Sequence, residues 1–535
     1  MRVRYVDTPQ GATPQFAGDA QSFTDWQQLG KIQPAYATLE PMGWPLDGSR
    51  QLLPDSPKTA YWSSNTREGF VCLRFPKSLS ATAVTVVFSP ATGEWCGSLE
   101  LRWYGGNDLL AKAVSQPTAS TWVVERVVEG FDRLELKLSQ PNLPGHFPKL
   151  QQVAVGKELW FDTSQLARIR LVNEIDPLLS KLTEDTMTLS VENVPFPLLP
   201  QKNQKLELYR GEELLSVQYL ESCSRERGDS YTFSCRSAIG LLDEEFLGGM
   251  YENTPAVSLL AQVLEGFDYE LLELENATLT GYLPITTRRE ALQHIAFALV
   301  AVVSTQGDGV IRVSPQKKIL AAPFEAKDIF EGSALVTQPA VSRVEVIAHR
   351  YTPGSGKQVL LQDEPVFGEN LLFPFSQPHH SYEITGGILT EAGANYVRIT
   401  ANGPVTLTAG DYLHTQTSHV RQASEAGEQS RSYTVDSATL VHSGNAQTVL
   451  NRLYATAALR QTLTQEVAVK DQRAGQTVTS QSPWGSQVQG YLTAMDSDLT
   501  RSGHTARVTV LGSELKWDGF GYAGQLYAGE KEALP

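Results

Sequence analysis

Short stretches of alternating apolar and polar residues, separated by Gly- and Pro-rich turns, dominate residues 65–156. Apolar residues recur at every second position or form β-branched runs, which is the pattern of a half-buried strand. Regular short strands of this kind are typical of an antiparallel sandwich or barrel. The predicted strands are GFVCLRF (70–76), TAVTVVF (82–88), GSLELRWY (97–104), TWVVERVV (121–128) and DRLELKL (132–138).

A second β-rich region begins near Trp160. Gly211 lies between two alternating stretches and predicts a hairpin turn. Pro177 and the cluster VPFPLLPQ (194–201) separate the other strands, because proline lacks the N–H that a strand interior needs. We expect strands in ARIRLVNEIDP (167–177), TMTLSVEN (186–193), KLELYRGEELLSVQYLESCSRE (205–226) and SYTFSCRS (230–237).

The period then changes to that of a helix. In TPAVSLLAQVLEGF (254–267) the apolar residues recur with helical spacing. TTRREALQHIAFALVAVVST (286–305) predicts a longer helix, in which Thr287 and Glu290 have the spacing of a capping box. GVIRVSP (309–315) returns to a strand, so this middle block is predicted to be α+β.

After residue 330 the pattern is again mainly that of strands. One amphipathic helix is expected in SGNAQTVLNRLYATAAL (443–459), and residues 516–535 predict an extended tail. The strands are expected in SRVEVIAHRY (342–351), SYEITGG (381–387), YVRITAN (396–402), PVTLTAGDYL (404–413), QEVAVK (465–470), GYLTAMD (490–496) and ARVTVLG (506–512).

Composition restricts the class of protein. Hydrophobic residues make up 41% of the chain and charged residues 19%, which is typical of globular domains. No run of 18 apolar residues occurs, so no membrane span is expected. The sequence MRVRYVDTPQG lacks the apolar core of a signal peptide, which favours assembly in a cytoplasm. The cysteines show no CxxC pair and are expected to be free thiols: Cys72, Cys96, Cys223 and Cys235.

Charge is distributed unevenly along the chain. Residues 1–158 hold 15 Lys and Arg against 15 Asp and Glu, so the whole net charge of −15 lies after residue 158. An acidic surface repels phosphate, which argues against a nucleic-acid-binding protein. The change near residue 158 also suggests a domain boundary.

Catalytic motifs are absent from the sequence. It contains no HExxH, GxSxG or GxxxxGK[ST] motif, and its nine histidines lack the spacing of a zinc site. An enzyme remains an alternative, namely a polysaccharide-degrading protein that uses two carboxylates after residue 158.

Aromatic residues supply the candidate binding site. Sugar faces stack on such rings, while carboxylates and amides bind the hydroxyls. The alternative is that these rings fill the sandwich core. The candidate ligand-binding residues are Trp44, Asp47, Arg50, Trp62, Trp103, Tyr104 and Asn107.

Residues 21–158 resemble the discoidin, or galactose-binding-like, jelly-roll module. The resemblance lies in PLDGS…PDSPKTAYWSS and in the strand series ending FDRLELKL…LQQVAVG. It implies a β-sandwich that binds a glycan or another surface ligand through loops at one end. It also implies a calcium ion in the Asp-Gly loop, which places calcium at Asp47.

Residues 165–512 resemble the central hub proteins of phage tails and phage-like injection machines. The resemblance rests on a succession of an opening β region, GYLPITTRREALQHIAFALVAVVSTQGDGVIRVSP and a closing β region. It implies two β-barrels with a small α+β domain between them. It also implies a homotrimer that contacts the tail tube or distal tail protein, the tape-measure protein and tip or fibre proteins.

We therefore predict a mainly β protein with an α+β insert. Its function would be structural and not enzymatic: a trimeric hub in a virion tail, assembled in a bacterial cytoplasm, whose sandwich binds a host glycan or a neighbouring tail protein. A stand-alone adhesin is a further alternative. The predicted segments are a leader (1–20), the sandwich (21–158), a first barrel (159–250), the α+β domain (251–330), a second barrel with an insertion (331–515) and the tail (516–535).

Overall fold

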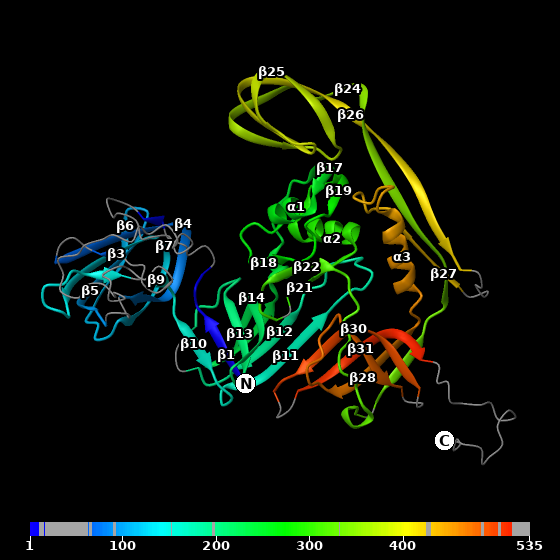
Figure 1. Cartoon of the computed structure of the whole chain (residues 1–535). Helices are drawn as coiled ribbons and strands as arrows, with labels where there is room; N and C mark the ends of the chain where they lie inside the picture. Colours follow the sequence, from blue (N-terminus) through cyan, green and yellow to red (C-terminus); the bar gives the residue numbers. More distant parts are fainter. Residues whose placement is uncertain are drawn as a thin grey trace, which may run out of the picture. The chain divides into compact units, whose positions relative to one another are not determined.

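The computed structural model describes residues 1–9, 15–16, 62–63, 67–88, 93–150, 152–194, 198–305, 307–330, 332–423, 430–482, 486–500 and 504–515. The described chain is mainly β, which confirms the predicted fold class (Figure 1). It forms two compact units. Unit 1 comprises Met1–Ala167, Ser190–Leu215 and Tyr219–Cys235, and unit 2 comprises Arg168–Leu189, Ser216–Gln218 and Arg236–Pro535.

Unit 1 contains a sheet in which β1 (Arg2–Val6) is an inner strand. β1 pairs antiparallel with β10 (Glu158–Phe161) and with β13 (Lys205–Arg210). The alternation of RVRYV buries Val3 and Tyr5 in the core. Residues 2–6 therefore form part of a sheet, whereas the sequence pattern placed them in a leader. The sheet continues with β14 (Glu213–Arg227) and β15 (Ser230–Arg236).

The sandwich is the second part of unit 1, and it lies between β1 and β10 in the sequence. Its main sheet has the order β2-β4-β7-β5-β6. The strands are β2 (Gln15–Phe16), β4 (Glu68–Val87), β7 (Thr121–Pro141), β5 (Cys96–Gly105) and β6 (Asp108–Ser115). β9 (Gln152–Val155) also pairs with β4, and β3 (Trp62–Ser63) pairs with β8 (Lys149–Leu150). Leucine, valine and phenylalanine side chains from alternate positions fill its core.

Two connections join the sandwich to the strands of unit 1, and they are hydrogen-bonded to each other. The Asp7 N–H donates to the Lys157 carbonyl at 3.0 Å. The buried Asp7 carboxylate accepts from the Thr82 hydroxyl and, at 3.0 Å, from the Gln204 amide. Burial raises the pKa of Asp7. Gly156 has φ 96°, and a Cβ there would lie 2.2 Å from the Asp7 carbonyl oxygen, so this close approach requires glycine.

The helices belong to unit 2. They are α1 (Ala256–Val263), α2 (Arg288–Leu299) and α3 (Ala446–Ala457), with 3₁₀ turns at Ala238–Leu241 and Ala326–Asp328. Thr287 and Glu290 form the predicted capping box of α2. The predicted helix 286–305 nevertheless ends at Leu299, because Val300 has a left-handed backbone conformation. The β-branched stretch that follows forms β21 (Ala301–Ser304), which pairs with β22 (Ile311–Pro315).

Short strands surround these helices, and a larger sheet forms the rest of unit 2. The short strands are β16 (Glu245–Phe246), β17 (Gly249–Pro255), β18 (Tyr269–Leu271), β19 (Thr278–Leu283) and β20 (Thr286–Thr287). The sheet has the order β12-β11-β30-β31-β28-β23, with β29 paired to β30. Its strands are β12 (Thr186–Val191), β11 (Leu166–Glu174), β30 (Gln487–Asp498), β31 (Thr505–Leu515), β28 (Gln461–Ala468), β23 (Ala334–Thr337) and β29 (Thr477–Gln481).

A long β-arm projects from unit 2 (Figure 1). We use "the arm" for β24 (Ala340–Pro374), β25 (His379–Ala392) and β26 (Tyr396–Gln422). β24 and β26 pair antiparallel along their length, and β25 folds back onto the far end of β26. β27 (Ser430–Val435) runs parallel to the first residues of β24. The sequence pattern predicted separate shorter strands here, because prolines and glycines interrupt the alternation between residues 352 and 374.

Aromatic rings are stacked at the root of the arm. The His349 and His414 rings share a hydrogen bond between Nδ1 and Nε2 at 2.9 Å. Tyr351 stacks on His414 with ring centroids 4.3 Å apart, and Tyr282 of β19 packs against Tyr351 at 5.4 Å. Burial and the neighbouring His414 lower the pKa of His349. The neutral form of His349 is therefore favoured at the root of the arm.

Candidate functional site

The solvent face of the sandwich sheet carries the candidate site. Alternation along β7 places Leu134, Leu136 and Leu138 in the core, and the residues between them point outward. The strand register then aligns the outward residues in rows across β4, β7 and β5. The rows are Phe70–Lys137–Glu100, Cys72–Glu135–Arg102 and Arg74–Arg133–Tyr104. We call this surface the outer sandwich face.

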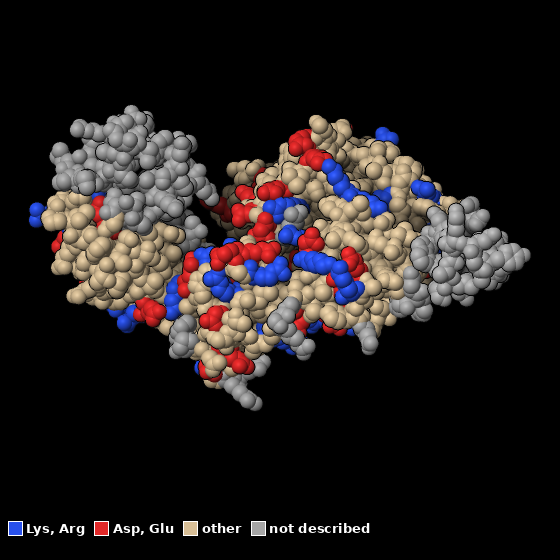
Figure 2. Space-filling view, turned by 60° about the horizontal axis from the view of Figure 1, so that its bottom comes forward, with Lys and Arg blue, Asp and Glu red and all other residues tan. Residues whose placement is uncertain are grey.

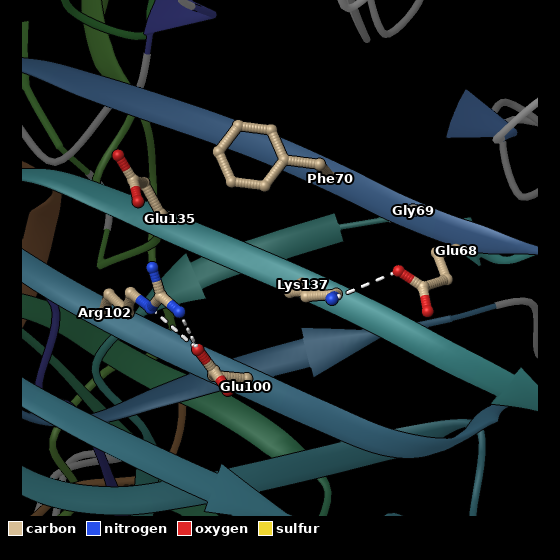
Figure 3. Close-up of a pocket in the computed structure, with 7 residues that line it drawn as sticks. All are labelled: Glu68, Gly69, Phe70, Glu100, Arg102, Glu135 and Lys137. Carbon is tan, nitrogen blue, oxygen red and sulfur yellow. Dashed lines mark hydrogen bonds and ion pairs between the residues drawn. The ribbon is translucent and has the colours of Figure 1, made fainter.

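A hollow of about 460 Å³ lies on this face (Figure 3). Carboxylates, cations and one aromatic ring line it together. Phe70 is 56% exposed, so its ring offers an apolar surface among charged groups. The lining residues are Glu68, Gly69, Phe70, Glu100, Arg102, Glu135 and Lys137.

Ion pairs hold the charged side chains of the hollow. Glu100 pairs with Lys112 at 3.0 Å and with Arg102 at 2.6 Å. These hydrogen bonds, first that of Lys112, lower the pKa of Glu100 below its usual value. Lys137 pairs with Glu68 at 3.1 Å across the neighbouring strands. Glu100 therefore stays ionised and serves as an acceptor, whereas the general acid of a glycosidase needs a raised pKa.

The described sequence-predicted residues fall into different environments. Trp103 is fully buried, so its ring fills the core and has no surface for a ligand, which corrects its assignment as a ligand-binding residue. Tyr104 lies on the outer sandwich face, with the Arg133 guanidinium 4.1 Å above its ring. Asn107 is exposed in the turn between β5 and β6. Of these three residues, only Tyr104 belongs to the rows that form the candidate site.

The remaining predicted residues precede the described strands. Trp44, Asp47 and Arg50 lie outside the described residues, and so does the calcium position predicted at Asp47. For Trp62 the structure describes only the backbone, which pairs with Leu150. A ligand site at these residues stays a prediction.

Sequence reasoning missed most residues of the hollow, although a signal for them exists. In DRLELKL the leucines alternate with Arg133, Glu135 and Lys137, so the three polar residues had to share the solvent face. What the pattern could not supply is the register that places Phe70 and Glu100 on either side of Lys137.

A buried charged cluster lies in another part of the sandwich. The Lys149 ammonium donates to both Glu94 oxygens, at 2.9 and 3.1 Å, and His146 Nδ1 lies 3.2 Å from Glu94. The cluster ties the segments before β5 and β8 together. Since its members pair with one another in the interior, we assign it a structural role.

Unit 2 has a smaller hollow, of about 230 Å³, on its sheet. Arg170 forms two hydrogen bonds to Asp496, at 2.6 and 2.7 Å. The hollow is lined by Arg168, Arg170, Glu466, Asp496, Asp498, Thr505, Ala506 and Arg507. On the surface that Figure 2 shows, acidic and basic side chains lie interspersed. Interspersed charges suit a solvated surface better than a phosphate-binding one.

The described residues show neither a metal-binding cluster nor a membrane-spanning helix. No group of three or more His, Cys, Asp or Glu side chains there is arranged to hold a metal ion. Likewise, none of the described helices combines the length and apolar character needed to cross a bilayer. The four cysteines are free thiols, as the sequence predicted.

Chemically, the outer sandwich face combines hydrogen-bond acceptors, hydrogen-bond donors and apolar rings. Its fixed carboxylates accept hydrogen bonds, its Arg and Lys side chains donate them, and Phe70 and Tyr104 offer apolar rings. Such a combination suits a polar ligand with apolar faces, either a saccharide or a protein surface.

Comparisons with known proteins give structural likenesses only. No protein-family model and no curated protein sequence matches the chain. The chain is similar to the 43 kDa tail protein of prophage MuSo2 from Shewanella oneidensis, with a TM-score of 0.42 and 10% identity over 66% of this chain and 96% of that one. It is also similar to a tail protein from Neisseria meningitidis MC58, with a TM-score of 0.39 and 13% identity over 67% and 94% of the two chains.

A third likeness is to the prophage tail protein gp18 from Listeria monocytogenes EGD-e. Its TM-score is 0.40, with 10% identity over 66% of this chain and 91% of that one. All three TM-scores lie below 0.5.

Proposed function

We propose that this chain is a structural component of a phage or phage-like tail tip, namely a trimeric hub between the tail tube and the tip. Its sandwich is an added module that contacts a host glycan or a neighbouring tail protein. The hub would bind the distal tail protein, the tape-measure protein and tip or fibre proteins, and it would act in the virion without enzymatic activity.

One observation carries the proposal: the sandwich is inserted into another sheet. β1 precedes the sandwich, β10 follows it, and the two strands pair with each other. The sheet of unit 1 is therefore built from segments on both sides of the module. Surface insertions of this kind add a binding function to a scaffold while its core stays intact. The succession of sheets around a helical section in unit 2 supports the hub resemblance of the sequence.

The binding role of the module is supported by the outer sandwich face. Its carboxylates and cations are held by ion pairs, so their positions are set before a ligand arrives. Preorganised polar groups beside an exposed ring lower the entropic cost of binding. Because the face is mixed in charge, it suits a neutral or mixed-charge partner better than a polyanion.

Two measurements test the proposal. Light scattering of the full chain, alone and with the tube protein of the same tail, is expected to give a trimer that joins the tube. A chain that stays monomeric at high concentration and does not bind the tube protein would contradict the proposed hub function. For the module, a glycan array is compared between the wild type and Phe70→Ala, with Val127→Ala as the matched exposed control near the other end of β7. Glycan binding that Phe70→Ala keeps in full would place the ligand away from the hollow.

A further inference from the structure

The arm has an apolar patch on the face turned away from its own core. At the far end, Val397, Ile399, Val405 and Leu407 of β26 point inward and are fully buried. The alternate positions of β26 point outward, and three apolar side chains of β24 and β25 stand beside them, namely Val359 opposite Thr408, Phe367 opposite Asn402 and Ile388 opposite Thr400. They are 55%, 67% and 66% exposed, respectively. The partners of Phe367 and Ile388, Asn402 and Thr400, are successive outward positions of β26, whereas Val359 lies further along the strand. We call Phe367 and Ile388 the arm patch.

Such exposure is unusual for side chains of this size. Large apolar residues that gather on one surface of a folded chain mark a contact with another molecule. β24 adds a second sign, because no side chain between residues 352 and 365 is fully buried, although β26 pairs with both β24 and β25 along residues 357–365. A thin sheet of three strands buries little apolar surface and gains from a partner.

The arm patch lies in acidic surroundings. Between residues 355 and 407 the chain has five carboxylates, and its two cations, Lys357 and Arg398, pair with two of them, Glu383 and Glu391. The excess consists of Asp363, Glu364 and Glu369, all exposed on the strand that carries Phe367. A partner surface should therefore be apolar with a cation at its edge.

Unit 2 itself carries a surface of this description. Ile319 and Leu320 are 55% and 68% exposed, although the segment is hydrogen-bonded along β29 through Ala321 and Thr477. Lys318 precedes them and is exposed, with the Gln489 side-chain oxygen at 3.2 Å. We call Lys318, Ile319 and Leu320 the linker patch.

The two patches lie on different parts of unit 2. The arm projects beyond β17 and β19 (Figure 1), whereas the linker patch follows β22 and is hydrogen-bonded along β29. The two patches of one chain are therefore separate surfaces. We propose that the arm patch docks onto the linker patch of a second copy, with Phe367 and Ile388 against Leu320 and the excess carboxylates beside Lys318. Because the two contact surfaces differ, this is a head-to-tail contact between copies.

Mixing two broken variants tests this geometry. Phe367→Ser with Ile388→Ser removes the arm patch, and Leu320→Ser removes the linker patch. In analytical ultracentrifugation each variant alone is expected to lose the self-association of the wild type. A mixture still contains one intact arm patch and one intact linker patch, so it is expected to form a dimer and nothing larger. Two variants that associate as fully as the wild type would overturn the proposal.

Charge exchange checks the pairing independently of folding. Lys318→Glu alone is expected to weaken association at low salt about tenfold or more, and Glu369→Lys on the partner copy should restore part of it. Val114→Ser, an equally exposed valine of the sandwich, serves as the control and should leave association unchanged. If the trimer of the proposed hub forms through other surfaces, it persists in every variant. That result would contradict the proposed arm contact but would remain consistent with the proposed hub.

Discussion

The sandwich and the arm both extend from a sheet-based unit, yet they are stabilised in opposite ways. Among the described residues, the sandwich surrounds twenty buried apolar residues from several strands. The far end of the arm surrounds five, and no side chain of β24 between residues 352 and 365 is fully buried. A large core makes a module stable by itself, whereas a thin ribbon depends on contacts at its root and with partners. An exposed apolar side chain therefore has a different consequence in each of the two regions.

The largest expected effect lies in the sandwich core. Trp103→Ala should lower the free energy of unfolding of the sandwich by about 3–5 kcal/mol, because it empties a fully enclosed site. Phe367→Ala on the arm removes a ring that is mostly exposed, so its effect should stay within about 0.5 kcal/mol. Hydrogen exchange of the β4, β5 and β7 amides measures the first, and that of β24 measures the second. Similar losses of unfolding free energy in both regions would show that Phe367 is packed as tightly as Trp103.

The arm core gives the next effect. Leu407→Ala should cost about 2–4 kcal/mol locally, since Leu407 is fully buried in the small cluster. We expect faster hydrogen exchange throughout residues 355–407, while protection of the sandwich and of β28 stays unchanged. Loss of protection across all of unit 2 would show instead that the arm and the sheet unfold together.

A substitution in the tightly packed backbone of the sandwich connection should cause a smaller loss of stability, and the sandwich offers a matched control glycine. Gly156→Ala places a Cβ 2.2 Å from the Asp7 carbonyl oxygen, so it should destabilise the connection by about 2 kcal/mol beyond the cost of the positive φ. Gly145→Ala has a similar φ of 84° but no atom within 4 Å of the new Cβ. The difference between the two melting temperatures isolates the clash. Equal melting temperatures would mean that the two connections separate without cost.

The smallest expected effect is the pH dependence of stability at two places: the sandwich connection around Asp7 and the root of the arm around His349. The two should have opposite signs. Asp7 has a raised pKa when folded, so its contribution to stability is present at low pH and is lost as pH rises through that pKa. His349 has a lowered pKa, so its contribution is present above pH ~6.5 and is lost as pH falls. The groups near its ring are His414, which stacks on it, and the Asp436 carboxylate, which partly opposes the shift.

Hydrogen exchange corrected for the intrinsic rate at each pH tests these signs. When the pH is lowered from 7.5 to 5, the protection of backbone amides from exchange should fall around residues 344–350. Around residues 3–8 it should stay constant or rise. His349→Gln should remove the first response, and Asp7→Asn the second. If protection changed in the same direction around Asp7 and around His349, in the wild type and in both variants, neither residue would be the cause of the pH dependence.

The sequence predicted local structure well where one face alone is buried. Thr287 and Glu290 formed the expected capping box, and DRLELKL formed a strand whose leucines fill the core. The prediction failed where partners are distant: β1 was missed, although its alternation of Val3 and Tyr5 was visible, because its partners lie more than 150 residues away. For the site, alternation indicated the outward residues of β7, and only the strand register could add Phe70 and Glu100.

The place of β1 in unit 1 has a consequence for biosynthesis. β1 leaves the ribosome before the sandwich, and its partners β10 and β13 follow only after it. At about 5–20 residues per second, the strand waits roughly 10–40 s for β13. The sandwich can fold during this time, since its strands pair among themselves, and folding brings the chain on either side of it together. Once the sandwich has folded, only a short loop remains to be closed between β1 and β10. The folded module therefore lowers the entropic cost of forming the sheet around β1.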